Sequence, residues 1–185
     1  MKSITYNKSA EETLELMRKN GIDRLYHFTD ISNLDSIVEN GGLYSLSYLK
    51  EQNITASFAS DQLSWDLDGI RGLDRYVSLS FVTNLPMYWK NIYKGGNHFV
   101  WLEIDIEVAT WKGTMFSDIN ATDHDARIGN CRQILSGLDL DFLSRDYSLS
   151  RLSRQEKKQM QAEVLVRDFV PLDRILNLKP FERSA

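Results

Sequence analysis

A chain of 185 residues and 21.4 kDa fits a single domain, and its 42% of hydrophobic residues with only three prolines excludes a disordered protein. No apolar run approaches the ~20 residues of a membrane span, and residues 1–5 lack the apolar core of a signal peptide, so we expect a soluble, cytoplasmic protein. The net charge of -4 argues against coating of duplex nucleic acid by charge alone, but it leaves open a short single strand held by a few local contacts.

The first 45 residues predict two helices and two strands. Ser9 and Glu12 have the spacing of a capping box, and Gly21 can adopt the left-handed conformation that ends a helix. An aromatic and β-branched run follows and predicts a strand, after which Asp30 and Asn33 can cap a second helix. We therefore expect elements at residues 9–21, 24–29, 30–41 and 43–44.

The middle of the chain predicts a loop and two half-buried strands. Residues 50–75 are polar and show no sustained period, which indicates a long loop or a lid with room for one helical turn. Residues 75–82 and 99–106 then alternate between apolar and polar side chains, as antiparallel strands with one solvated face do. In the first of these strands, Tyr76, Ser78 and Ser80 share a face opposite Val77, Leu79 and Phe81.

The last third of the chain predicts short helices and strands around a polar loop. Residues 118–125 are dense in hydrogen-bonding groups, which is typical of a loop, and a basic helix at 152–160 runs into an apolar strand at 161–166. Weaker patterns predict a strand at 114–117, helical pieces around 137–146 and a closing strand at 174–178. Because no βαβαβ rhythm is present, we expect an α+β fold.

Several common functional motifs are absent from the sequence. There is no GxGxxG after a strand and no GxxxxGK[ST], so binding of NAD or ATP would need another architecture. No GxSxG elbow is present, and the single cysteine, Cys131, excludes an intramolecular disulfide and a cysteine-based zinc cluster. His27, His98 and His124 form no HExxH or HxH pair, so we expect no catalytic metal.

Glu163 carries the most information, because it lies in a strand-like run of alanine, valine and leucine. An ionised carboxylate in such a run costs free energy unless it is paired or faces water. One interpretation is simple alternation, with Gln161, Glu163 and Leu165 directed to solvent. The other is a carboxylate held rigidly on a sheet and facing a pocket, as a hydrogen-bond acceptor or general base.

Three further features allow a structural and a functional interpretation. His27 lies among aromatic residues and is either a core histidine with one backbone contact or a neutral imidazole that holds a ribose hydroxyl or an amide. Arg71, between Gly69 and Gly72, is either a solvated loop charge or a clamp on a diphosphate. The basic helix is either a solvated surface or a means of drawing a polyanion toward Glu163.

Four segments, in this order along the chain, resemble the DarT family of DNA ADP-ribosyltransferases. They look like an opening NAD-binding motif, a second strand followed by Pro-Met, a Thr-Asp-x-Asn-Ala loop and a catalytic Gln-Ala-Glu-Phe-Leu-Val strand, at residues 25–42, 76–87, 116–121 and 161–166. The resemblance covers residues 24–178. Ser117 stands where the family often has threonine, and Val164 where it often has phenylalanine.

The resemblance implies an ADP-ribosyltransferase fold, in which a small split β-sheet with surrounding helices binds NAD in a cleft, here as a single domain over residues 1–185. It implies a toxin of the glycosyltransferase class that moves ADP-ribose from NAD, its co-substrate, to a base of single-stranded DNA without a metal. Such toxins are paired with a macrodomain antitoxin, and we expect a monomer with no membrane contact. Residues 64–69 resemble the guanine-modifying branch more than the thymine-modifying one.

The resemblance also implies roles for individual residues. Glu163 is the expected catalytic carboxylate, and Arg71 is the expected arginine that contacts NAD and assists catalysis. The other expected residues are His27, Thr29, Asn33, Tyr76 and Ser80 for NAD, with Asn120, Thr122, Arg154, Lys157 and Lys158 for DNA.

Other functions fit the same residues. The acidic residues around Arg71, which are Asp61, Asp66, Asp68 and Asp74, would repel a nucleic acid along their path, and this keeps RNA or a protein side chain open as the acceptor. A catalytically inactive NAD-binding module and an NAD-consuming hydrolase are the two remaining alternatives.

Overall fold

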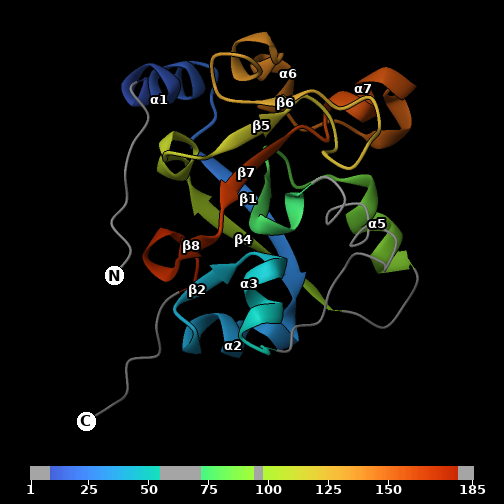
Figure 1. The fold of residues 1–185 in the computed structure, drawn as a ribbon. Coiled ribbons are helices and arrows are strands. Elements are labelled where there is room, and N and C mark those ends of the chain that lie inside the picture. Colours follow the sequence, from blue (N-terminus) through green and yellow to red (C-terminus); the bar gives the residue numbers. More distant parts are fainter. Residues whose placement is uncertain (1–8, 55–71, 94–97, 179–185) are drawn as a thin grey trace.

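In the computed structural model, residues 9–54, 72–93 and 98–178 are described. Short helices surround a six-stranded antiparallel sheet and a separate two-stranded sheet (Figure 1). The helices are α1 (Ala10–Lys19), α2 (Leu34–Glu39), α3 (Leu46–Glu51), α5 (Pro86–Tyr93), α6 (Leu140–Leu143) and α7 (Arg154–Gln159). The strands are β1 (Arg24–Asp30), β2 (Gly42–Tyr44), β3 (Tyr76–Ser80), β4 (Phe99–Asp105), β5 (Met115–Ser117), β6 (Ile128–Gly129), β7 (Glu163–Arg167) and β8 (Phe169–Pro171). This mixture confirms the predicted α+β class.

The large sheet has the strand order β4-β1-β3-β7-β5-β6, and it is split between its second and third strands. β1 pairs with β4 along its whole length, from Arg24 to Asp30. On its other side, β1 shares a register pair with β3 only where Tyr26 faces Ser80. The two strands then diverge, which leaves backbone groups and side chains of both available to line a cavity.

The apolar residues of β7 anchor the sheet in the core. Val164, Leu165 and Val166 are all at most 1% exposed, so both faces of this strand are covered. A strand that is buried on both faces reads as a continuous apolar run, which is the pattern seen after Glu163 in the sequence. The strand that begins with Glu163 is therefore held firmly by its neighbours.

Most of the helices lie in two groups, and α5 lies apart from both, at the right of Figure 1. Figure 1 shows α1, α6 and α7 near β5 and β6, and α2 and α3 near the small sheet of β2 and β8. Gly42 of β2 lies against Val170 and Pro171 of β8 so closely that a Cβ on it would come within 2.2 Å of the Val170 carbonyl oxygen. The two-stranded sheet therefore requires glycine at this position.

The closing strand predicted at 174–178 is wrong. Within residues 98–178, the last strand is β8, and Ile175 makes only an isolated bridge with Ile104. The side chain of Asn177 accepts from the backbone N–H of Glu103 at 2.9 Å and donates to the carbonyl oxygen of Trp101 at 2.9 Å. The Asn177 side chain occupies backbone groups of β4 that a further strand would use. The segment therefore packs along β4 without forming a regular strand.

The capping box predicted for the first helix is also absent. The Ser9 side chain makes no capping hydrogen bond, because its Oγ lies 3.2 Å from the Sγ of the buried Cys131. A complete capping box occurs instead at α7, where Ser153 accepts from the backbone N–H of Glu156 and Glu156 accepts from that of Ser153. The helices predicted at these two places are nevertheless confirmed.

Candidate active site

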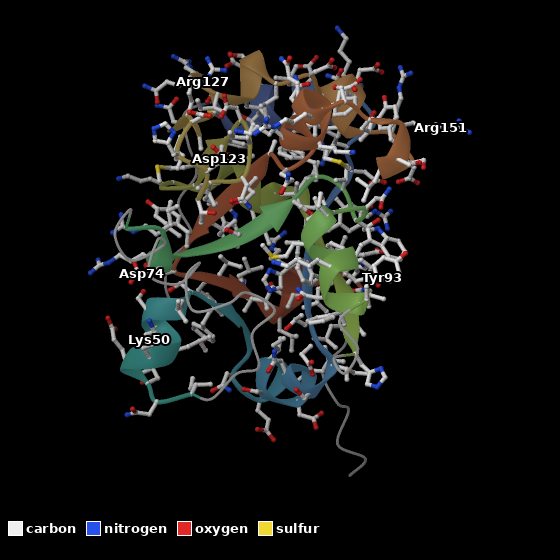
Figure 2. The ribbon with its side chains drawn as sticks, turned by 90° about the vertical axis from the view of Figure 1, so that its right-hand side faces the viewer. Lys50, Asp74, Tyr93, Asp123, Arg127 and Arg151 are labelled. Atoms are coloured by element: carbon white, nitrogen blue, oxygen red, sulfur yellow. The ribbon has the colours of Figure 1, made fainter. Side chains whose placement is uncertain are left out.

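A pocket of about 290 Å³ lies between β1 and β3, at the split in the sheet. Its volume is close to the lower end of the roughly 300–1,000 Å³ found for small-molecule sites. Figure 2 views the molecule with Asp74, which lines the pocket, below the loop that carries Asp123 and Arg127. Eight of the predicted site residues line this pocket: His27, Thr29, Asn33, Tyr76, Ser80, Asn120, Thr122 and Glu163.

Glu163 is half-buried and lies at the start of β7, which pairs with β3 on the side away from β1. Across the sheet it faces Ser80 on one side and Ser117 on the other. Its Oε1 accepts from the Nδ2 of Asn120 at 3.1 Å, and its Oε2 lies 3.4 Å from the Oγ of Ser78, which donates to it. Both oxygens are therefore held in place, and the carboxylate faces the pocket.

One interpretation of the sequence directs Gln161, Glu163 and Leu165 to solvent, and it is wrong for Leu165. Leu165 is fully buried, against Leu73 and Ala121. Glu163 and Gln161 both line the pocket. Alternation places residues on one face of a strand but does not determine what covers that face, because the covering segments come from distant parts of the chain.

Asn120 is oriented by its own loop. Its Oδ1 accepts from the backbone N–H of Thr122 at 3.0 Å and also from the Thr122 hydroxyl. An amide oxygen that is occupied in this way directs the amide nitrogen to the opposite side, toward Glu163. Thr122 therefore determines which end of the Asn120 side chain meets the carboxylate.

His27 connects the two diverging strands. Its Nδ1 lies 3.0 Å from the carbonyl oxygen of Ser78, which can only accept, so Nδ1 carries the proton. Burial lowers the pKa of this imidazole below its ordinary value, and the hydrogen bond to Ser78 opposes that shift. A neutral ring with its proton on Nδ1 has an acceptor at Nε2, which suits it to receive a hydrogen bond from a ligand hydroxyl or amide.

Buried polar side chains line the pocket next to His27. Thr29 and Asn33 are both buried, and the Nδ2 of Asn33 donates to the Oγ1 of Thr29 at 3.0 Å. Ser80 is also buried and donates its hydroxyl proton to the carbonyl oxygen of Val82 at 2.6 Å. Together they give the pocket fixed polar groups, of which Ser80 lies directly across the sheet from Glu163.

The predicted basic residues of α7 do not line the pocket. Arg154 is exposed, and Lys157 is partly exposed. Lys158 pairs with Asp123 at 2.8 Å and with Asp125 at 3.3 Å. The structure therefore does not bring these three residues together with Glu163.

Some expectations fall on segments outside the described residues. Arg71, expected to contact NAD, is one of these, and so is the segment 64–69 that resembles the guanine-modifying branch. The possible lid at 50–75 is described only at its ends, where α3 and a short helical turn at Leu73–Arg75 lie.

Several pocket residues were not among the predicted site residues, and Ser78 and Gln161 are two polar examples. Ser78 lies on the same face of β3 as Tyr76 and Ser80, so the alternation of this strand could have identified it. Gln161 precedes Glu163 by two residues, and its Nε2 donates to the Lys157 carbonyl oxygen at 2.6 Å. The apolar end of the pocket, with Ile37, Leu43, Leu46 and Leu49, gives no signal in the sequence that separates it from the core.

The described part of the chain contains neither a cluster of metal ligands nor a helix suited to a bilayer. No group of three or more His, Cys, Asp or Glu side chains there could hold a metal ion. No helix within that part is long and apolar enough to cross a bilayer.

The chemistry that this pocket can support follows from its groups. A carboxylate fixed on a sheet can stabilise positive charge that develops at an adjacent carbon, as in glycoside cleavage. A neutral imidazole acceptor and buried hydroxyls can orient a ligand rich in hydroxyl and amide groups. The pocket is therefore suited to breaking a bond at the anomeric carbon of a ribose.

Comparison with known proteins gives a consistent result. The sequence model of the family described as "ssDNA thymidine ADP-ribosyltransferase, DarT" matches residues 26–179. The chain is similar to Thermus sp. 2.9 DarT in complex with ADP-ribosylated ssDNA, with a TM-score of 0.67 and 20% identity over 83% of this chain and 79% of that chain. It is also similar to the same protein in complex with NAD+, with a TM-score of 0.61 and 21% identity over 83% and 79%.

A further similar structure is a larger protein. Thermosipho africanus DarTG in complex with ADP-ribose gives a TM-score of 0.63 and 18% identity over 83% of this chain and 42% of that chain, so this chain spans less than half of it. Comparison with the curated proteins finds no match. At these identities the structural similarity shows the fold, whereas the family match covers most of the chain. The chain belongs to the DarT family, described as ssDNA thymidine ADP-ribosyltransferase.

Proposed function

We propose that this protein transfers ADP-ribose from NAD to a base of single-stranded DNA. The observation that carries the proposal is Glu163, which faces a pocket at the split in the sheet with both carboxylate oxygens hydrogen-bonded. Membership of the DarT family and the similarity to a DarT in complex with NAD+ support the same reaction. The reaction moves a glycosyl group, so the enzyme would be of the glycosyltransferase class.

In this reaction the bond between the nicotinamide nitrogen and the anomeric carbon breaks, and its electron pair leaves with nicotinamide. Positive charge then develops on the ribose, and the carboxylate of Glu163 stabilises it while accepting from the ribose 2′-hydroxyl. A base nitrogen forms the new bond to the anomeric carbon. Its proton passes to Glu163 or to a water that Glu163 orders.

In this proposal, one group of pocket residues binds NAD and another lies on the side of the acceptor. His27 offers Nε2 as an acceptor for a ribose hydroxyl or for the nicotinamide amide, and the buried pair of Thr29 and Asn33 lies beside it. Tyr76 and Ser80 line the same space. The proposed role of Arg71 is to hold the diphosphate in a bent conformation that favours attack.

The acceptor side is proposed to lie at the loop after β5. Asn120 and Thr122 line the pocket next to Glu163, and the exposed Arg154 with Lys157 would attract the phosphates of the strand. Lys158, whose ammonium group is paired with two aspartates, is not part of this proposed surface. An unpaired strand is the proposed substrate, because bases in a duplex hide their reactive edges.

The proposal also names the DNA base that is modified. The resemblance of residues 64–69 to the guanine-modifying branch supports guanine, whereas the description of the matching family names thymidine. We propose guanine as the modified base. A panel of oligonucleotides that differ in one base provides a separate result for each alternative.

The proposed biological setting is a toxin–antitoxin system. The chain would act in the cytoplasm as a monomeric single domain, and a macrodomain antitoxin would remove the ADP-ribose that it attaches. The similarity to DarTG in complex with ADP-ribose supports a link to ADP-ribose chemistry, although this chain spans only 42% of that protein.

The test is mass spectrometry of short single-stranded oligonucleotides after incubation with NAD and either the wild-type protein or its Glu163→Ala variant. We expect one ADP-ribose unit on the guanine-containing oligonucleotide with wild type and none with the variant. An adduct on the thymidine-containing one alone would correct the base and leave the reaction standing. An adduct that persists in Glu163→Ala would refute the catalytic role.

The remaining outcomes separate the other functions. Adducts on RNA or protein but not on DNA would reassign the acceptor. Free ADP-ribose as the dominant product in the presence of every acceptor would indicate a hydrolase. NAD binding without turnover, unchanged by Glu163→Ala, would indicate a catalytically inactive binding module.

A further inference from the structure

The loop between β5 and β6 is held closed at its base. The backbone N–H of Asp118 donates to the Arg127 carbonyl oxygen at 3.3 Å. In return, the backbone N–H and the Nε of Arg127 donate to the Asp118 carboxylate at 2.9 and 2.6 Å. These contacts fix the two ends of the loop, and Thr122 orients the Asn120 side chain within it, so the position of the tip at residues 122–125 depends on further contacts.

The side chain of Lys158 ties the tip of the loop to α7. The Nζ of Lys158 lies 2.8 Å from Asp123 and 3.3 Å from Asp125, both on the loop. Lys158 and Asp123 are only 36% and 27% exposed, so this pair is partly sheltered from solvent.

A continuous series of contacts connects Lys158 to the catalytic carboxylate. Asp123, which Lys158 holds, donates from its backbone N–H to the Asn120 carbonyl oxygen at 2.9 Å. The side chain of Asn120 then donates to Glu163 at 3.1 Å. Each contact in the series fixes the position of the next group.

We propose that Lys158 is a positioning residue for Glu163. It holds the loop tip through Asp123 so that Asn120 can hydrogen-bond to the carboxylate. The inference rests on the proposed function, because it assigns Lys158 to catalysis rather than to binding of DNA. It corrects the assignment that the basic pattern of α7 suggests, in which Lys158 would contact phosphates.

Charge explains why removal of Lys158 would move the loop. The loop carries three aspartates within eight residues, and Asp118 is already paired with Arg127. Without Lys158, Asp123 would keep the backbone N–H of Asp125 at 3.0 Å and Asp125 would keep the Nδ1 of His124 at 2.8 Å, but the ammonium group that joins both carboxylates to α7 would be lost. Like charges that are no longer compensated repel, and the tip would shift away from Glu163.

The effect on rate is expected to exceed the effect on stability. A partly exposed ion pair contributes little to the stability of the fold. A displacement of about 1 Å at a reacting group can lower the rate by about 100-fold. Loss of Lys158 should therefore lower kcat about tenfold or more while the protein stays folded.

The experiment compares Lys158→Gln, Lys158→Arg and a control, Lys112→Gln, which changes an exposed lysine that does not line the pocket. For each we would measure kcat and the KM for the oligonucleotide in ADP-ribosyl transfer, and amide hydrogen exchange at residues 118–127. We expect Lys158→Gln to lower kcat at unchanged KM and to speed exchange in the loop. Lys158→Arg should keep most of the wild-type kcat and most of the wild-type protection of the loop from exchange. Lys112→Gln should match wild type in both measurements.

A second variant tests the route through the loop. Asp123→Asn removes the carboxylate that Lys158 holds but keeps the backbone contact to Asn120. The losses of kcat in Asp123→Asn and Lys158→Gln should not add in the double variant, because both remove the same interaction. Additive losses would show that Lys158 acts independently of the loop and would overturn the proposal.

The remaining outcomes are distinct. A raised KM for the oligonucleotide with unchanged kcat and unchanged exchange in Lys158→Gln would assign Lys158 to DNA binding and overturn the inference. A wild-type protein without any transfer would refute the proposed function itself. Hydrogen exchange would then still show whether Lys158 holds the loop, since that measurement does not depend on activity.

Discussion

His27 reaches across the split in the sheet and donates from Nδ1 to the carbonyl oxygen of Ser78, at 3.0 Å. β1 and β3 share a register pair only at Tyr26 and Ser80, so this side chain supplies a contact between the strands where their ladder has ended. The same contact leaves Nε2 as the ring's acceptor. One side chain thus keeps the cleft open at a defined width and provides a group that can bind a ligand within it.

The first prediction concerns the pH dependence that follows from His27. Burial lowers the pKa of its imidazole below 6.5, the ordinary value. Below that pH the unfolded chain binds the proton more readily than the folded one, so stability is complete above about pH 6.5 and falls as the pH drops toward the lowered value. Urea unfolding at about pH 7.5 and about pH 5.5 should show this loss in wild type.

The control is His27→Asn, whose Nδ2 can still donate to the Ser78 carbonyl oxygen but which does not titrate. The variant should lose less stability than wild type between the two pH values. It should also bind NAD more weakly, because it lacks the acceptor at Nε2. Equal losses of stability in the two proteins would show that other groups cause the pH dependence.

The second prediction concerns Gly42. Alanine at this position would place its Cβ 2.2 Å from the Val170 carbonyl oxygen and 2.8 Å from the Cα of Pro171, both backbone atoms that cannot move aside alone. Gly42→Ala should therefore separate β2 from β8 and lower the free energy of unfolding by about 1–3 kcal/mol or more. A urea or thermal unfolding curve measures this loss.

Gly137→Ala is the matched control for Gly42→Ala. A Cβ at Gly137 would meet nothing within 4 Å, and its backbone does not have a positive φ. Its stability should stay within about 0.5 kcal/mol of wild type. If the two variants unfold alike, the close approach of β2 to β8 is not a constraint on the fold.

The third prediction separates two serines that share one sequence pattern. Ser9 with Glu12 and Ser153 with Glu156 both have capping-box spacing, but only the second pair forms the box. Ser153→Ala should lower stability by about 1 kcal/mol, the usual effect of losing an N-cap. Ser9→Ala should not show a capping loss, because its hydroxyl contacts Cys131.

Thermal unfolding of the two variants checks this prediction. The lower midpoint should belong to Ser153→Ala. A larger loss in Ser9→Ala would mean that the contact between Ser9 and Cys131 stabilises the fold more than a helix cap does.

The comparison of these serines shows which parts of the fold the sequence could predict. Strands with clean alternation, such as β3 and β4, were predicted within one or two residues, because periodicity reports on burial along the strand itself. The closing strand was wrong because the Asn177 side chain bonds to the backbone of the distant β4, and the capping box at Ser9 is absent because Ser9 contacts the distant Cys131. Such contacts depend on tertiary structure, which a local pattern does not contain.

More of the site could be predicted than local sequence patterns alone would allow. Eight predicted residues do line one pocket, although they come from segments as distant as β1 and β7. The resemblance to a family supplied that grouping, whereas periodicity supplied only the face of each strand. The role of Lys158 could not be predicted, because a basic helix reads the same whether its lysines face solvent or pair with a neighbouring loop.

The fourth prediction concerns two buried serines on the same face of the large sheet, on either side of Glu163. Ser117 is fully buried, and within the described residues its Oγ has no hydrogen-bond partner. Ser80 is also buried, but its Oγ donates to the Val82 carbonyl oxygen at 2.6 Å. The same substitution should therefore change stability in opposite directions at the two positions.

Ser117→Ala removes a hydroxyl that lost its water on folding and gained no partner, so it should raise the free energy of unfolding by about 1 kcal/mol. Ser80→Ala leaves the Val82 carbonyl oxygen without its donor and should lower the free energy of unfolding by about 1–3 kcal/mol. Urea unfolding of both variants measures the two signs. Destabilisation by Ser117→Ala would show that its hydroxyl does have a partner in solution, and a buried water between Ser117 and Glu163 would be the first candidate, because such a water would also hold the carboxylate.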